Sequence, residues 1–160
     1  MSRAVELGLP MFLGILGGTP EHWARYGHAY RAAWDEAGHP AEQADIAVAV
    51  HGFVAESDAQ ARSTYLEHEH RMMAEGLAEL GRPAPSPADR AAQYGPDGMV
   101  FVGSPDEITD RILHLHGLFG HTRQILQMDV GGMPQRDFLH AIELLGTKVL
   151  PQIRAELAWP

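Results

Sequence analysis

Apolar residues along the chain follow two alternating patterns. Three stretches, 10–16, 45–55 and 124–130, are rich in apolar side chains, and the first two are almost continuously apolar, as is typical of parallel strands covered on both faces. A weaker run at 99–102 is a fourth candidate strand. After these stretches, apolar residues recur every three or four positions, as on a helix with one buried face. Strands that alternate with helices predict βαβ units and a parallel sheet.

The predicted helices begin at residues suited to capping. A hydroxyl side chain is followed by a first-turn proline or by the polar partner of a capping box. The three starts are Thr19-Pro20-Glu21, Ser57 with Gln60, and Ser104-Pro105-Asp106-Glu107. We expect the first two helices to end near Gly38 and Leu80, and a last helix to run from Pro134 to Leu150. Three prolines at 83, 85 and 87 predict a surface excursion without regular structure.

The number of strands sets the fold class. The 160 residues fit one domain, 1–160, and a closed eight-stranded barrel typically needs about 250 residues. The prediction is an α/β fold with three to four parallel strands and flanking helices, which is too few strands for a complete barrel. A small parallel sheet leaves two unpaired edges, which favours a place in a larger assembly.

Composition excludes several classes of function. The chain has no cysteine, so disulfides, thiolate zinc sites and cysteine nucleophiles are excluded, and the cytoplasm is the expected compartment. The formal charge of -9, with Lys148 as the only lysine, argues against a nucleic-acid partner. No apolar run approaches the roughly 20 residues of a membrane span.

Barrel active sites lie at the carboxyl ends of the strands, and polar residues there are the candidates for chemistry. His51 lies in an otherwise apolar strand and could perform acid-base work, although a hydrogen-bonded core histidine is the commoner case. Gln127 and Asp129 share a strand face with Ile125, and we expect these two polar groups to enter the interior together.

Glycines and histidines at other positions carry weaker signals. Gly-Gly pairs at 17–18 and 131–132 could bring backbone amides to an anion, or could simply form turns. No metal site is expected from the ten histidines, because His68 and His70 lie two apart on a predicted helix and do not face each other. We expect the polar run from Glu67 to Arg71 to be a solvated helix face.

Longer motifs resemble one enzyme family. The helix start GSPDE at 103–107, the strand FGHTRQILQMDVGGMP at 119–134 and the ending ELLGTKVLPQIR at 143–154 are similar to the C-terminal end of luciferase-like, flavin-dependent monooxygenases. The stretch GLPMFLGILGGTPEHWARYGHAYRAAWDEAGH, followed by HGFVAES, resembles the section just before it. The resemblance covers nearly the whole chain.

This resemblance implies a partial TIM (β/α)8 barrel that lacks the N-terminal strands, in a family that uses reduced FMN or the deazaflavin F420 for an oxygen- or hydride-transfer reaction on a small-molecule substrate. The chain would supply the sixth, seventh and eighth strands, with His51, Gln127 and Asp129 lining the pocket and Gly17, Gly18, Phe53, Gly131 and Gly132 near the cofactor. A complete flavin site would then need a homodimer or a separate N-terminal half-barrel chain. The alternative is a non-catalytic half-barrel that assembles or binds a small molecule.

Overall fold

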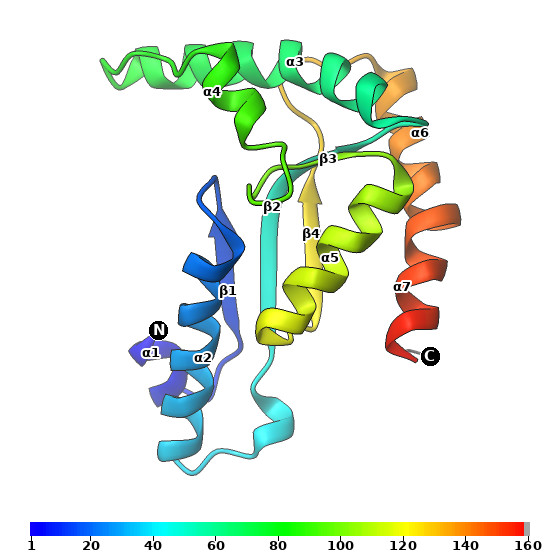
Figure 1. Ribbon diagram of the computed structural model, residues 1–160. Coiled ribbons are helices and arrows are strands. Elements are labelled where there is room, and N and C mark those ends of the chain that lie inside the picture. Colours follow the sequence, from blue (N-terminus) through cyan, green and yellow to red (C-terminus); the bar gives the residue numbers. More distant parts are fainter. Residues whose placement is uncertain (159–160) are drawn as a thin grey trace.

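The computed structural model describes residues 1–158 as an α/β fold built on four parallel strands (Figure 1). The strands are β1 (Met11–Ile15), β2 (Ile46–Val54), β3 (Phe101–Gly103) and β4 (Arg123–Gln127). The central strand is β2, which pairs with β1 and β4 along its first part and with β3 over its last three residues. The predicted fold class of three to four parallel strands with flanking helices is confirmed.

The helices begin at the predicted caps. The principal helices are α2 (Pro20–Glu36), α3 (Asp58–Glu79), α5 (Pro105–Phe119), α6 (Gln135–Leu144) and α7 (Leu150–Leu157), with short helices α1 (Ser2–Glu6), α4 (Pro87–Ala92) and η1 (Ala41–Gln43). The side chains of Thr19, Ser57 and Ser104 each accept a hydrogen bond from the backbone N–H three residues ahead. These caps satisfy N–H groups that a helix start leaves unpaired.

Three boundaries differ from the predictions. First, β4 ends at Gln127 rather than at 130. Its pairing with β2 stops at the pair of Gln127 and His51, and the chain then turns beneath α3. Second, the proline-rich segment contains α4, which starts at Pro87 behind a capping box between Ser86 and Asp89. Proline at the first helical position costs no hydrogen bond, since that N–H has no partner in a helix.

Third, the C-terminal helix does not stop at Leu150. A π-helical turn, η2 (Leu145–Val149), joins α6 to α7, and the helix continues through Pro151 to Leu157. Proline inside an α-helix removes one hydrogen bond and crowds the preceding turn. A π turn changes the local hydrogen-bond pattern and so accommodates the proline.

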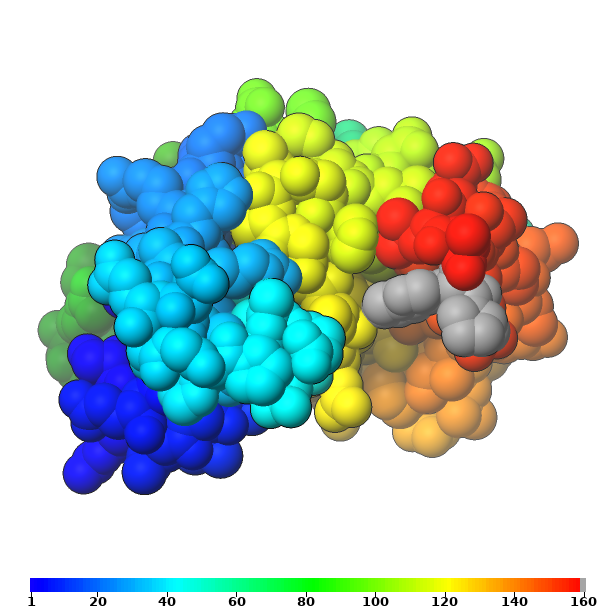
Figure 2. All heavy atoms as spheres, turned by 90° about the horizontal axis from the view of Figure 1, so that it is seen from below, coloured from blue at the N-terminus to red at the C-terminus, as the bar shows by residue number. Residues whose placement is uncertain are grey.

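The helices cover one face of the sheet. Seen from below, residues near 115–125 (yellow) lie between the α2 segment (blue) and the C-terminal helix (red) (Figure 2), and α5 packs against both neighbours. The alternate β2 residues Ile46, Val48 and Val50 point into this layer and are fully buried with Tyr30 and Trp34. A second core lies beneath α3 and α4, which cross the carboxyl ends of the strands (Figure 1).

On the opposite face of the sheet, α3 lies over the carboxyl end, where it buries His51, while the rest of this face has no helix of residues 1–158 over it. The register places Phe12, Ala47 and Arg123 in one row and Gly14, Ala49 and Ile125 in the next. Phe12 is 61% exposed and Ile125 is 38% exposed. This uncovered side, which we call the open face, combines large apolar side chains with small ones.

Candidate functional site

His51 lies at the point where β2, β4 and α3 meet. It is paired in register with Gln127 and belongs to the same strand face as Ala47 and Ala49, so its side chain starts from the open face. Its ring is 5% exposed, and Nδ1 lies 3.4 Å from Oε1 of Glu69 on α3. His51 is thus a buried histidine whose carboxylate partner can orient the ring, and its catalytic role stays a prediction.

Glu69 is the centre of a buried polar cluster, which consists of His51, Glu69, Arg90 and Tyr94. The Arg90 guanidinium donates from Nε to Oε2 at 3.2 Å and from Nη2 to Oε1, and the Tyr94 hydroxyl donates to Oε2 at 2.8 Å. Burial by itself raises the pKa of Glu69, but the hydrogen bonds from His51, Arg90 and Tyr94, with the Arg90 charge, lower it to about 2. Glu69 is therefore an ionised carboxylate within the protein core.

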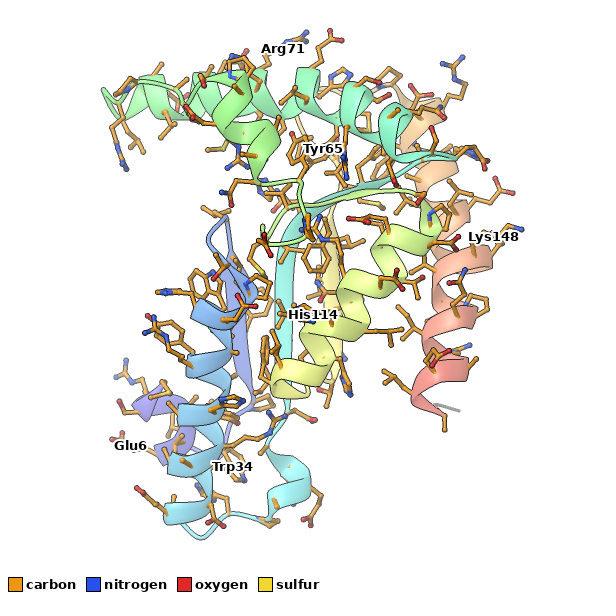
Figure 3. All side chains as sticks on the ribbon, viewed as in Figure 1. Glu6, Trp34, Tyr65, Arg71, His114 and Lys148 are labelled. Atoms are coloured by element: carbon orange, nitrogen blue, oxygen red, sulfur yellow. The ribbon has the colours of Figure 1, made fainter. Side chains whose placement is uncertain are left out.

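Two buried tyrosines, Tyr65 and Tyr94, also belong to this site. Tyr65 points from α3 towards the strand ends, whereas Arg71 on the same helix points away from them (Figure 3). The Tyr65 hydroxyl donates to the backbone carbonyl of Gln127 at 3.3 Å. Burial, reinforced by the Glu69 charge, raises the pKa of both Tyr65 and Tyr94, so both phenols stay protonated and act as donors.

Glu69 is buried, contrary to the prediction from the sequence. The run from Glu67 to Arg71 was expected to be solvated, and this holds for Glu67 and Arg71, which form an exposed ion pair, but Glu69 is 0% exposed. Ala61, Tyr65 and Glu69 recur every four residues, a spacing that puts them on one helix face. This spacing was the available signal, but neither Arg90 nor Tyr94 carries any local sign of its partner.

Gln127 and Asp129 are both exposed. Gln127 ends β4 on the open face, and Asp129 lies two residues beyond the strand. The structure thus brings Gln127 beside His51 in the register, and it leaves both polar groups on a surface rather than in an enclosed interior.

Three backbone polar groups of the two Gly-Gly pairs have protein partners. Gly18 has a φ of 98°, and its N–H donates to the Gln93 side chain at 3.2 Å, while the Gly17 carbonyl accepts from the Trp23 indole at 2.8 Å. The Gly131 carbonyl lies 3.2 Å from Nδ1 of His68. The chain thus bends at 17–18 and turns at 131–132, and the contact of these glycines with a cofactor stays a prediction.

Phe53, the remaining residue predicted near the cofactor, is 2% exposed and stacks on Tyr65 in the second core. The site therefore fits a flavin only in part. On the open face, the small residues Gly14, Ala47 and Ala49 leave room for the flat ring of a flavin to pack against the sheet. The Gly18 N–H is already bonded to a side chain, so this group does not offer a free donor to a phosphate.

An apolar cleft of about 530 Å³ flanks β4 on the helix-covered side. Its walls come from α5, β4 and the α6–α7 helix, with Leu126, Leu145, Val149 and Ile153 among the lining residues. Within residues 1–158, β4 pairs only with β2, so its other edge is free along this cleft.

Two searches of the described residues found no further site. No group of three or more His, Cys, Asp or Glu side chains in residues 1–158 could hold a metal ion. In the same range, no helix has both the length and the apolar character needed to cross a membrane.

Comparison with known proteins identifies relatives. The sequence profile of a family described as luciferase-like monooxygenase matches residues 1–122. No curated protein matches the chain. Among solved structures, the monooxygenase RslO1 from Streptomyces bottropensis is 26% identical, with a TM-score of 0.69 over 94% of this chain and 44% of its own.

Two further solved structures share the fold at lower identity. The oxygenating constituent of 3,6-diketocamphane monooxygenase from Pseudomonas putida, a complex with FMN, is 21% identical, with a TM-score of 0.66 over 95% of this chain and 45% of its own. The coenzyme F420 dependent tetrahydromethanopterin reductase from Methanopyrus kandleri is 20% identical, with a TM-score of 0.54 over 88% of this chain and 45% of its own. The chain spans less than half the length of all three structures.

Proposed function

Because the chain belongs to the luciferase-like monooxygenase family, we propose that it supplies the last three strand-helix units of a flavin-dependent oxidoreductase barrel. The open face is the observation that carries this proposal. Phe12 and Ile125 are exposed on it in successive rows, separated by Gly14, Ala47 and Ala49. A sheet face with this composition is stable when other strands close over it and bury it as a barrel interior.

In this proposal the chemistry belongs to the cofactor, reduced FMN or F420, and the chain positions it. One relative was solved with FMN and another is named as F420 dependent, which supports a cofactor of this type. His51 and Gln127 would contact the ring from the carboxyl end of the open face, and Asp129 would lie at its rim. The turns at 17–18 and 131–132 flank the same end, and the phosphate would be held by strands outside residues 1–158.

The remaining strands would come from a second copy or from a separate N-terminal half-barrel. Both β1 and β4 have a free edge within the described residues, as a barrel segment requires at its two ends. The apolar cleft beside β4 contains Ile142 and Leu150, which are 44% and 39% exposed. A strand paired with β4 would place its outward side chains in this cleft, where they would cover Ile142 and Leu150.

Assembly and flavin binding can be measured together. We expect gel filtration of the purified chain to give a dimer or larger species, and FMN or F420 titration, followed by flavin fluorescence, to show binding only in the assembled fraction. An Ile125→Asp substitution should dissociate the assembly, because it puts a charge on the open face. A matched Leu139→Asp substitution, at an exposed position on α6, should leave the assembly intact.

A stable monomer with native circular dichroism, unchanged by Ile125→Asp, would contradict the covering of the open face. Absence of flavin binding by an assembly that contains all eight strands would contradict the enzyme assignment.

The same open face also favours the second candidate, a non-catalytic assembly or small-molecule-binding protein. An assembly that dissociates with Ile125→Asp, but binds neither FMN nor F420, would support this candidate over the enzyme.

A further inference from the structure

The buried polar cluster controls which nitrogen of His51 carries a proton. Glu69 contacts Nδ1 of the ring, whereas no hydrogen bond joins Nε2 to another residue of 1–158. The two ring nitrogens point in divergent directions, so a ring whose Nδ1 faces α3 turns Nε2 away from that helix. His51 starts from the open face, in register with Gln127.

The charge state of Glu69 decides the direction of this hydrogen bond. Arg90 binds both carboxylate oxygens, and Tyr94 donates to one of them. Three donors converge on a carboxylate of 0% exposure, and a deprotonated carboxylate can only accept. The hydrogen between Glu69 and His51 must therefore belong to Nδ1 of the histidine.

A neutral imidazole has one protonated nitrogen and one acceptor. With the proton fixed on Nδ1, Nε2 is the acceptor. Neutral histidine in water favours the opposite tautomer, so the arrangement depends on the carboxylate.

We propose that Glu69 is a positioning residue that fixes His51 in the Nδ1–H tautomer, so that Nε2 accepts a hydrogen bond from an N–H or O–H group of a ligand held on the open face. The identity of this ligand as a flavin rests on the proposed function, but the tautomer does not. Arg90 and Tyr94 support the arrangement because they keep Glu69 ionised and fixed in place.

Nitrogen-15 NMR of the histidine-labelled chain tests the tautomer directly. We expect the long-range proton-nitrogen pattern of an Nδ1–H tautomer for His51 under conditions in which the ring is neutral. In the double variant Glu69→Leu/Arg90→Met, which replaces the buried pair with apolar residues, His51 should change to the Nε2–H pattern. The matched control Glu67→Leu/Arg71→Met removes an exposed pair from the same helix and should leave the His51 pattern unchanged.

An Nε2–H pattern in the unsubstituted chain would overturn the proposal, as would an Nδ1–H pattern in a folded Glu69→Leu/Arg90→Met chain. If that variant does not fold, the spectrum of the unsubstituted chain still decides between the two tautomers.

A second measurement uses reduced FMN as the probe for the ligand. In the flavin-binding assembly, the loss of one hydrogen bond to Nε2 should weaken reduced FMN binding by a factor of about ten in Glu69→Leu/Arg90→Met, and not in the control. Equal affinity of Glu69→Leu/Arg90→Met and of the control for reduced FMN would overturn the role of Nε2. If the unsubstituted assembly binds no FMN, the proposed function fails, while the NMR result still decides the tautomer.

Discussion

The Tyr65 hydroxyl on α3 donates to the backbone carbonyl of Gln127, where β4 ends, across 3.3 Å. This contact joins the helix over the site to a strand on the opposite side of β2 from β1. It fixes α3 above His51 and Gln127 through a side chain that is itself fully buried.

Tyr65→Phe should lower the free energy of unfolding by about 1–2 kcal/mol, because the Gln127 carbonyl loses its buried donor. Urea unfolding followed by circular dichroism measures the change. Tyr26→Phe, at a half-exposed position on α2, is the matched control and should change the stability by less than about 0.5 kcal/mol. Equal effects of the two substitutions would show that the Tyr65 hydrogen bond contributes nothing specific.

Arg90→Met should be among the most damaging single substitutions. It leaves the buried Glu69 carboxylate without its cation, which costs about 3–5 kcal/mol in comparable buried pairs. Adding Glu69→Leu should restore much of the loss, because the core then contains no unpaired charge. Arg71→Met removes only an exposed partner and should be close to neutral. Additive effects of Arg90→Met and Glu69→Leu would contradict the pairing.

The Glu69 carboxylate should make the protein less stable in acid. Its pKa is about 2 in the folded chain and 4.5 in a free side chain, so the folded state favours the ionised form. This contribution is complete above the unfolded pKa and is lost as the pH falls from about 4.5 through 2. Unfolding free energies measured across this window should converge for the unsubstituted chain and Glu69→Gln as the pH falls. A constant difference between the two chains would contradict the lowered pKa.

Gly131 and Gly132 should differ in their tolerance of alanine. Both have positive φ, 57° and 71°, but a Cβ at Gly131 would lie 2.1 Å from the His68 carbonyl oxygen, whereas one at Gly132 has no atom within 4 Å. Gly132→Ala should cost about 1–2 kcal/mol from backbone strain alone. Gly131→Ala should cost clearly more, because the loop must also move away from α3. Thermal unfolding of both variants measures the difference, and equal melting temperatures would show that the close approach is not needed.

The sequence by itself determined the order of strands and helices and most helix starts, because caps and apolar periodicity are local properties. Thr19, Ser57 and Ser104 define their helices without reference to any distant residue. It also placed His51 within the strand that the structure shows as β2. The tertiary structure alone decided the partner of His51. Glu69 comes from α3, whereas Arg90 and Tyr94 come from α4 and the turn after it, and no local pattern encodes the approach of these segments.

The two faces of β2 show the same difference between what the sequence predicts and what the tertiary structure decides. The near-continuous apolar run of residues 45–55 is that of a strand buried on both sides, and this much can be taken from the sequence. In the structure, Val48 is buried beneath the helices, while Ala47 and Ala49 lie on the open face between Phe12 and Ile125. Periodicity records how much apolar surface a strand must bury, whereas only the arrangement of neighbouring elements decides which face they cover.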